Sequence, residues 1–308
     1  MAKARKITGI KISTDARDGA ALVLHSRFDE IDQFQHQALK PRDMEGVHDM
    51  RVATRRLRSV LLDFNPLLKK SALKPVKNEI KQLANALGSV RDLDAAIITL
   101  EKLKLKTRNP LIKKGVGKLL GNRSVLREKA RAQLEAFLKT NDLSKLHERF
   151  DSAVEEAVRQ KKSAQSCTFE EFGLTAISIK LEEFRDLSKT IYTPFDAEGL
   201  HDFRLSAKRL RYTIELFSTR PKLVKFAGKL SRMQDFLGEV HDCDLWIDAL
   251  SNDLLNDRLK QSDYKTDTWL LSRFTEIRSK NYRSALALWC SWEESELLEK
   301  IAAAIRKE

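Results

Sequence analysis

Apolar residues recur at intervals of three and four positions along almost the whole chain. This spacing matches one face of an α-helix, whereas the two-residue alternation of a half-buried strand is scarce. Only eleven glycines and six prolines are available to interrupt the pattern in 308 residues. The pattern therefore predicts an all-α protein built from amphipathic helices.

The same spacing predicts ten helices, and each half of the chain reads as an up-and-down helical bundle. The predicted helices span 15–40, 46–64, 72–103, 110–140 and 142–160, then 169–192, 199–218, 222–252, 263–288 and 291–306. Prolines mark the ends of the second and seventh helices, because proline disrupts a helix interior: Pro41 and Pro66, and Pro194 and Pro221. The expected domains are a basic lead-in at 1–14, a first bundle at 15–160, a polar linker at 161–168 and a second bundle at 169–308.

Two predicted helices repeat one unusual sequence. The segment GVHDMRVATRRLR, Gly46–Arg58, returns 153 residues later as GLHDFRLSAKRLR, Gly199–Arg211. A second motif follows each copy at an offset of 150, in Leu87–Asp94 and Leu237–Asp244. Two similar halves are therefore predicted, and we expect them to pair about a pseudo-twofold axis so that their basic faces meet across one cleft.

Each copy of the first motif places one histidine and three cations in a single sector of its helix, since successive residues turn by about 100°. These residues are His48, Arg51, Arg55 and Arg58 in the first copy and His201, Arg204, Lys208 and Arg211 in the second. Further candidates for the same basic site are Arg56 and Arg209 beside each sector, Arg27 and Lys180 upstream, and Arg91 and His241 in the second motif. The acidic residues of the second motif are expected to hold arginines in position and not to bind a metal: Asp92, Asp94, Asp242 and Asp244.

The charge balance points to a polyanionic partner. Lys and Arg outnumber Asp and Glu by 57 to 44, which gives a formal net charge of +13. Nucleic acid, an anionic membrane surface and inorganic phosphate polymers all fit this balance. No apolar run approaches the ~20 residues of a membrane helix, the first residues lack a secretion signal, and the three cysteines lack a CxxC spacing. We therefore expect no membrane insertion and a cytoplasmic location.

At its repeated motifs the chain resembles the CHAD family, the conserved histidine α-helical domain. The resemblance rests on His48–Arg58 and His201–Arg211 and on the two segments that begin at Leu87 and Leu237, and it covers roughly residues 15–300. It implies two four-helix bundles around a central basic cavity, binding of inorganic polyphosphate and association with polyphosphate granules. Members often carry a triphosphate-tunnel domain as well, for which this chain has no room, so it resembles the stand-alone type.

Two positions depart from the repeat. His241 stands where the first half has Arg91, and Lys208 stands where it has Arg55. Both replacements keep a group that can be cationic, so the resemblance to a polyphosphate-binding protein is retained.

The chemistry of polyphosphate suits these residue types. The polymer offers only acceptor oxygens, and arginine presents a planar fork of five donors that stays charged. Cations three or four residues apart on a helix follow one another about every 5 Å along its axis. Histidine has a reference pKa of about 6.5, and a bound polyanion favours its protonated form. We therefore expect binding to tighten as the pH falls.

Two other functions remain open on the sequence. A nucleic-acid binder would fit the net charge, although aromatic residues are only 7% of the chain and do not interleave with the basic faces. A metal-dependent phosphohydrolase would fit three His-Asp dipeptides, which begin at His48, His201 and His241, but the remaining ligand pattern is absent. No phosphate-binding loop or nucleophile elbow is present. We expect a binding module with no enzymatic activity and no cofactor, with other polyanions as possible partners.

Overall fold

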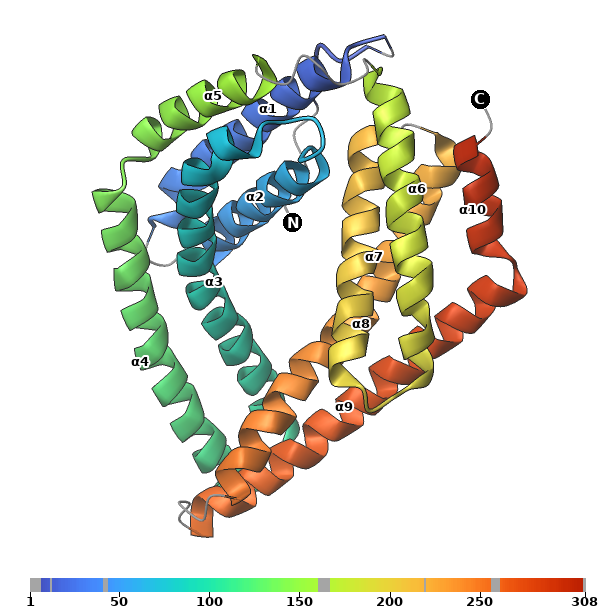
Figure 1. The fold of residues 1–308 in the computed structure, drawn as a ribbon. Coiled ribbons are helices and arrows are strands. Elements are labelled where there is room, and N and C mark those ends of the chain that lie inside the picture. Colours follow the sequence, from blue (N-terminus) through green and yellow to red (C-terminus); the bar gives the residue numbers. More distant parts are fainter. Residues whose placement is uncertain are drawn as a thin grey trace. The chain divides into compact units, whose positions relative to one another are not determined.

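The computed structural model describes residues 7–11, 13–40, 44–159, 167–218, 220–255 and 261–306. Within these ranges the regular structure is helical (Figure 1), together with one isolated antiparallel bridge between Asp15 and Thr168. The predicted all-α class is confirmed. Pro41 and most of the predicted linker, 161–166, lie outside the described residues.

In the part of the chain that the structure describes, ten α-helices follow the predicted order, together with one short 3-10 helix. In the first half they are α1 (Ala16–Ala38), α2 (Met44–Asp63), α3 (Lys70–Lys106), α4 (Pro110–Thr140) and α5 (Leu143–Arg159). In the second half they are α6 (Phe169–Leu187), η1 (Ser188–Tyr192), α7 (Ala197–Phe217), α8 (Pro221–Leu255), α9 (Gln261–Glu294) and α10 (Leu297–Arg306).

The largest difference from the predicted bounds is the break between the last two helices. It was predicted near residue 290, but α9 continues to Glu294 and the chain turns at Glu296, which has a positive φ of 46°. The physical reason is that Trp289 and Trp292, each 3% exposed, continue the buried face of α9 past the predicted break. The sixth predicted helix also tightens into η1 over its last five residues, as helix ends often do.

Side-chain caps and prolines explain several helix starts. Asp15 accepts a hydrogen bond from the Arg17 backbone N–H at 2.8 Å, and Asp196 accepts one from Gly199 at 2.8 Å. Both satisfy backbone donors that a helix leaves unpaired at its start. Pro110 and Pro221 occupy the first positions of α4 and α8, where a missing N–H costs nothing.

The chain divides into two compact units. The first unit comprises Met1–Arg108 and Val116–Phe169. Within it α1 contacts α2, α2 contacts α3, α3 contacts α5 and α5 contacts α1, which closes a four-helix bundle. Its core includes fully buried Phe28 and Phe150, whose ring centroids are 4.8 Å apart. This core fixes α2, which carries the first basic motif.

The second unit comprises Asn109–Gly115 and Glu170–Glu308. In it α8 contacts both α7 and α9, and α10 packs on α8 and α9. An aromatic core joins α6, α7 and α9, because the Phe184 ring lies 4.9 Å from that of Phe203, which in turn lies 5.6 Å from Trp289. This core fixes α7, which carries the second basic motif. The pseudo-twofold pairing of the halves and the central basic cavity stay predictions.

No described helix has a stretch long and apolar enough to cross a membrane.

Candidate functional site

The two motif helices bury one face and leave the basic face in contact with solvent. On α2, Val47, Met50 and Leu57 are completely buried. On α7, the matching Leu200, Phe203 and Leu210 are buried as well. The remaining sector carries the predicted cations: His48, Arg51 and Arg55 are half-buried and Arg58 is exposed, while His201, Arg204, Lys208 and Arg211 are half-buried.

The two sequence motifs of each half meet where neighbouring helices pack. Arg51 of α2 donates a hydrogen bond to the Asp92 carboxylate of α3 at 2.5 Å and approaches the Gly88 carbonyl oxygen at 3.4 Å. In the second unit Arg204 lies over Gly238, since a Cβ placed on that glycine would be 3.5 Å from the arginine Nε. In both units the glycine of the second motif therefore lies next to the first arginine of the first motif, Arg51 or Arg204.

The motif histidines also face the second motif. Partial burial lowers the pKa of His48, and the nearby charge of Arg91 lowers this pKa further. In the second unit the Nδ1 atoms of His201 and His241 are 3.1 Å apart and the ring centroids are 4.1 Å apart. Burial is the main cause that lowers the pKa of each of these two histidines, followed by Arg204 for His201 and by the partner ring for His241. The free protein therefore favours neutral histidines in both units.

A buried glutamate holds two of the predicted cations in the first unit. Glu30 of α1 is 2% exposed and pairs with Arg27, which is itself 7% exposed. The other oxygen of Glu30 lies 3.7 Å from Nη1 of Arg56 on α2. These contacts place Arg27 in the core and explain why Arg56 lies beside the basic sector and not within it.

The second unit repeats this arrangement. Glu183 of α6 accepts hydrogen bonds from Lys180 and from Arg209 of α7, both at 2.7 Å. Burial raises the pKa of Glu183, but the two hydrogen bonds outweigh that effect and lower it overall. Glu30 and Glu183 were not among the predicted site residues, although the offset of 153 residues that aligns their partners aligns them too.

The second aspartate of each second motif anchors an arginine from a more distant helix. Asp94 is completely buried and accepts a hydrogen bond from Nε of Arg127 on α4 at 2.8 Å. Asp244 accepts one from Nε of Arg278 on α9 at 2.5 Å, and Arg278 also donates to the Pro194 carbonyl oxygen. Sequence reasoning missed both arginines, which follow their aspartates by 33 and 34 residues.

The acidic residues of the second motif thus differ in their surroundings. Asp92 and Asp242 are exposed, whereas Asp94 is buried and Asp244 half-buried. Among the described residues no group of three or more histidines, cysteines or carboxylates has the geometry to hold a metal ion. Asp92, Asp94 and Asp244 each pair with an arginine.

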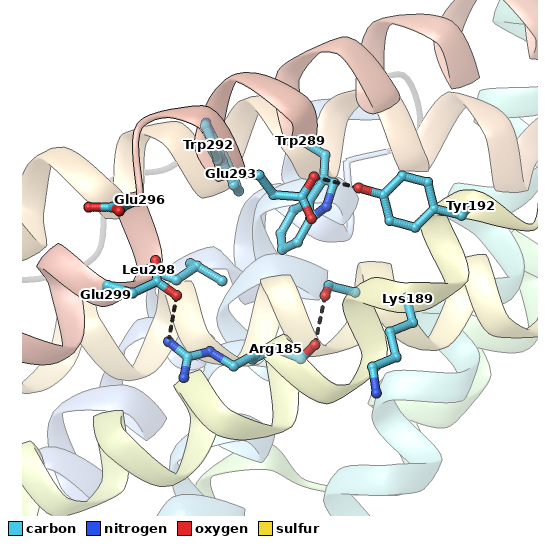
Figure 2. Close-up of a pocket in the computed structure, with 10 residues that line it drawn as sticks. Arg185, Lys189, Tyr192, Trp289, Trp292, Glu293, Glu296, Leu298 and Glu299 are labelled. Atoms are coloured by element: carbon cyan, nitrogen blue, oxygen red, sulfur yellow. Dashed lines mark hydrogen bonds and ion pairs between the residues drawn. The ribbon is translucent and has the colours of Figure 1, made fainter.

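A cavity of about 510 Å³ lies apart from the predicted residues, within the second unit. Figure 2 shows its lining, which comprises Arg185, Ser188, Lys189, Tyr192, Trp289, Trp292, Glu293, Glu296, Leu298 and Glu299. The Tyr192 hydroxyl donates a hydrogen bond to Glu293, and this bond raises the pKa of the tyrosine. Three carboxylates face two cations in this lining, so the cavity lacks the cationic excess of the basic faces.

Comparison with known proteins gives one family. The model of the CHAD domain matches residues 22–251. The uncharacterized protein MT2285 of Mycobacterium tuberculosis (strain CDC 1551 / Oshkosh) is 30% identical over 188 residues, which make up 58% of this chain and 35% of that protein. The chain therefore matches only about a third of the length of this relative.

Two solved structures share the fold. The CHAD domain of the plant Ricinus communis superposes with a TM-score of 0.70 at 17% identity, covering 92% of this chain and 95% of that one. PptA from Streptomyces chartreusis superposes with a TM-score of 0.70 at 14% identity, covering 90% of this chain and 99% of that one. The matched segment contains both copies of both motifs, and on this basis the chain belongs to the CHAD domain family.

Proposed function

We propose that this CHAD domain binds inorganic polyphosphate through the basic faces of α2 and α7. The observation that carries the proposal is the repeated junction of the two motifs. In each unit a motif helix presents a histidine and three cations, and the next helix adds Arg91 or His241 beside the histidine. Two such surfaces on one chain supply many donors for a polymer that offers only acceptors.

The carboxylate contacts support this proposal because they preorganise the cations. Asp92 holds Arg51 by one of its terminal nitrogens, and an arginine has five N–H donors in all. The remaining donors can bind phosphate oxygens without the entropy cost of ordering a free side chain. Asp92 is itself exposed, so a bound polyanion can also displace it.

The predicted site residues take two roles in this proposal. The contacting groups are those of the basic sectors and the second motif: His48, Arg51, Arg55, Arg58, Arg91, His201, Arg204, Lys208, Arg211 and His241. Arg27, Lys180, Arg56 and Arg209 already pair with Glu30 or Glu183 and act as positioning residues that fix the motif helix.

The test is calorimetric titration of long-chain polyphosphate into the wild type and two double variants. Arg51→Ala with Arg204→Ala removes one motif cation from each unit and should weaken binding about 100-fold, at about 1.4 kcal/mol for each lost charged hydrogen-bonding group. The matched control, Arg159→Ala with Arg283→Ala, removes two exposed arginines, also one from each unit, and should change the affinity less than about threefold. Equal losses in the two double variants would contradict the proposal.

Two further outcomes separate polyphosphate binding from the alternatives. Displacement of polyphosphate by duplex DNA at equal phosphate concentration would favour a nucleic-acid binder. We expect binding without turnover. Release of orthophosphate in the presence of Mg²⁺ or Mn²⁺, if abolished by His48→Ala, would instead indicate an enzyme.

Because the proposed ligand is a long polymer, we also propose that the protein associates with polyphosphate granules. Co-sedimentation of the protein with isolated granules would test this.

A further inference from the structure

The two basic faces differ at one position where the motifs meet. In the first unit His48 faces the permanent cation Arg91. In the second unit His201 faces another histidine, His241, with the two Nδ1 atoms 3.1 Å apart. The first junction therefore keeps a fixed charge across the physiological pH range, and the second can gain or lose one.

The geometry of the histidine pair limits how many protons it holds. A contact of 3.1 Å between two ring nitrogens is a hydrogen bond only if one nitrogen carries hydrogen and the other is an acceptor. One added proton leaves the pair as an imidazolium and an imidazole that share this bond. A second proton would set two N–H groups against each other, so the pair favours a single added proton.

Burial, together with the charge of Arg204, disfavours that proton while no ligand is bound. Arg204 and Lys208 lie on the same helix as His201, and Arg204 also acts on His241. The neighbouring carboxylates are Asp202 on α7 and Asp242 and Asp244 on α8, and Arg278 from α9 is paired with Asp244. A phosphate chain lying on Arg204 and Lys208 would reverse the balance of charge at the pair.

We propose that binding of polyphosphate to the second basic face is coupled to the uptake of one proton by the His201–His241 pair. The inference rests on the proposed function and adds a regulation to it: acidification strengthens the second face, while the first face keeps its Arg91 charge. In the pH range where the free pair is neutral and the bound pair is charged, the affinity should rise by up to about tenfold for each unit of falling pH.

The test is calorimetric titration of polyphosphate near pH 7 in two buffers of different ionisation enthalpy, which reports the protons taken up per binding event. His241→Arg gives the second unit the arginine of the first, and the first unit shows that an arginine is accepted at this position. This variant should still bind polyphosphate but take up fewer protons than the wild type and show a weaker pH dependence, because the histidine pair is lost while the single histidines His48 and His201 remain. The reciprocal Arg91→His should create a second histidine pair and increase the uptake.

His36→Gln provides the control, because His36 is an exposed histidine near the end of α1. It should leave the proton uptake at the wild-type value. Unchanged uptake in His241→Arg, with binding retained, would overturn the coupling and leave the proposed function intact. Absence of polyphosphate binding by the wild type at every pH would instead overturn the proposed function.

Discussion

Two glutamates form ion pairs with four of the predicted cations and hold them in place. Glu30 and Glu183 lie at equivalent positions of the repeat, and each forms ion pairs with a basic residue three positions earlier and with an arginine of the motif helix. A carboxylate between two cations removes part of the repulsion that a basic face creates within a folded protein. The side chain that permits a dense cationic surface is therefore an acidic one.

We predict that Glu183→Gln lowers the stability of the folded protein at neutral pH but not in acid. The pKa of Glu183 is lower in the folded protein, so its ionised form adds stability above the usual glutamate pKa of about 4.3. That contribution is lost as the pH falls through the lower folded-state pKa. Urea unfolding should show that the variant's free energy of unfolding is about 1 kcal/mol lower than that of the wild type at pH 7, and that this difference disappears in acid. The exposed Glu294→Gln should show no such dependence, and a constant difference at all pH values for Glu183→Gln would contradict the assignment.

Long-range ion pairs connect helices that are neighbours in the chain. Asp94 joins α3 to Arg127 of α4, and Asp244 joins α8 to Arg278 of α9. Both aspartates lie two residues after an exposed aspartate of the same motif, on a different side of the helix. In the first unit this short motif therefore serves two purposes, since Asp92 pairs with Arg51 of the basic face and Asp94 fixes the next helix.

The different surroundings of Asp92 and Asp94 predict that the same Asp→Asn substitution lowers stability by different amounts at the two positions. Asp94→Asn leaves the buried pair with Arg127 broken and should lower the free energy of unfolding by about 3 kcal/mol. Asp92→Asn affects the pair between Arg51 and an exposed carboxylate, and should cost less than about 1 kcal/mol. Thermal and urea unfolding at pH 7 provide the comparison. Similar losses for both variants would show that burial does not separate their roles.

The two compact units are not two consecutive halves of the chain. Asn109–Gly115, which includes the first residues of α4, belongs to the second unit, and the helix continues from Val116 in the first. Gly115 lies against α9, because a Cβ placed on it would be only 2.0 Å from Oγ1 of Thr266. A residue without a side chain is therefore required where α4 meets α9.

Two Gly→Ala substitutions in the same helix should consequently have opposite effects. Gly115→Ala should destabilise the protein by about 1–3 kcal/mol, because the added methyl group has no space beside Thr266. Gly121→Ala meets no atom within 4 Å and should stabilise it by about 1 kcal/mol, since alanine is the better helix former. Calorimetric melting of the two variants tests this, and stabilisation by both would contradict the close approach.

The sequence alone determined the helices, the repeat and the composition of the basic faces. These follow from local rules: the 3.6-residue period separates Met50 and Leu57 from Arg51 and Arg55, and proline marks where α8 begins. Even here packing decided one boundary, because the burial of Trp289 and Trp292 extended α9 past its predicted end.

Only the tertiary structure decided which groups meet. The contacts of Glu30 with Arg56, of Asp94 with Arg127 and of His201 with His241 join residues that lie 26 to 40 positions apart. No local periodicity determines such pairs, because they depend on how two helices are turned toward each other when their apolar faces are buried. The charge of the basic faces could thus be predicted from the chain, but the carboxylates that order those charges and the histidine pair required the fold.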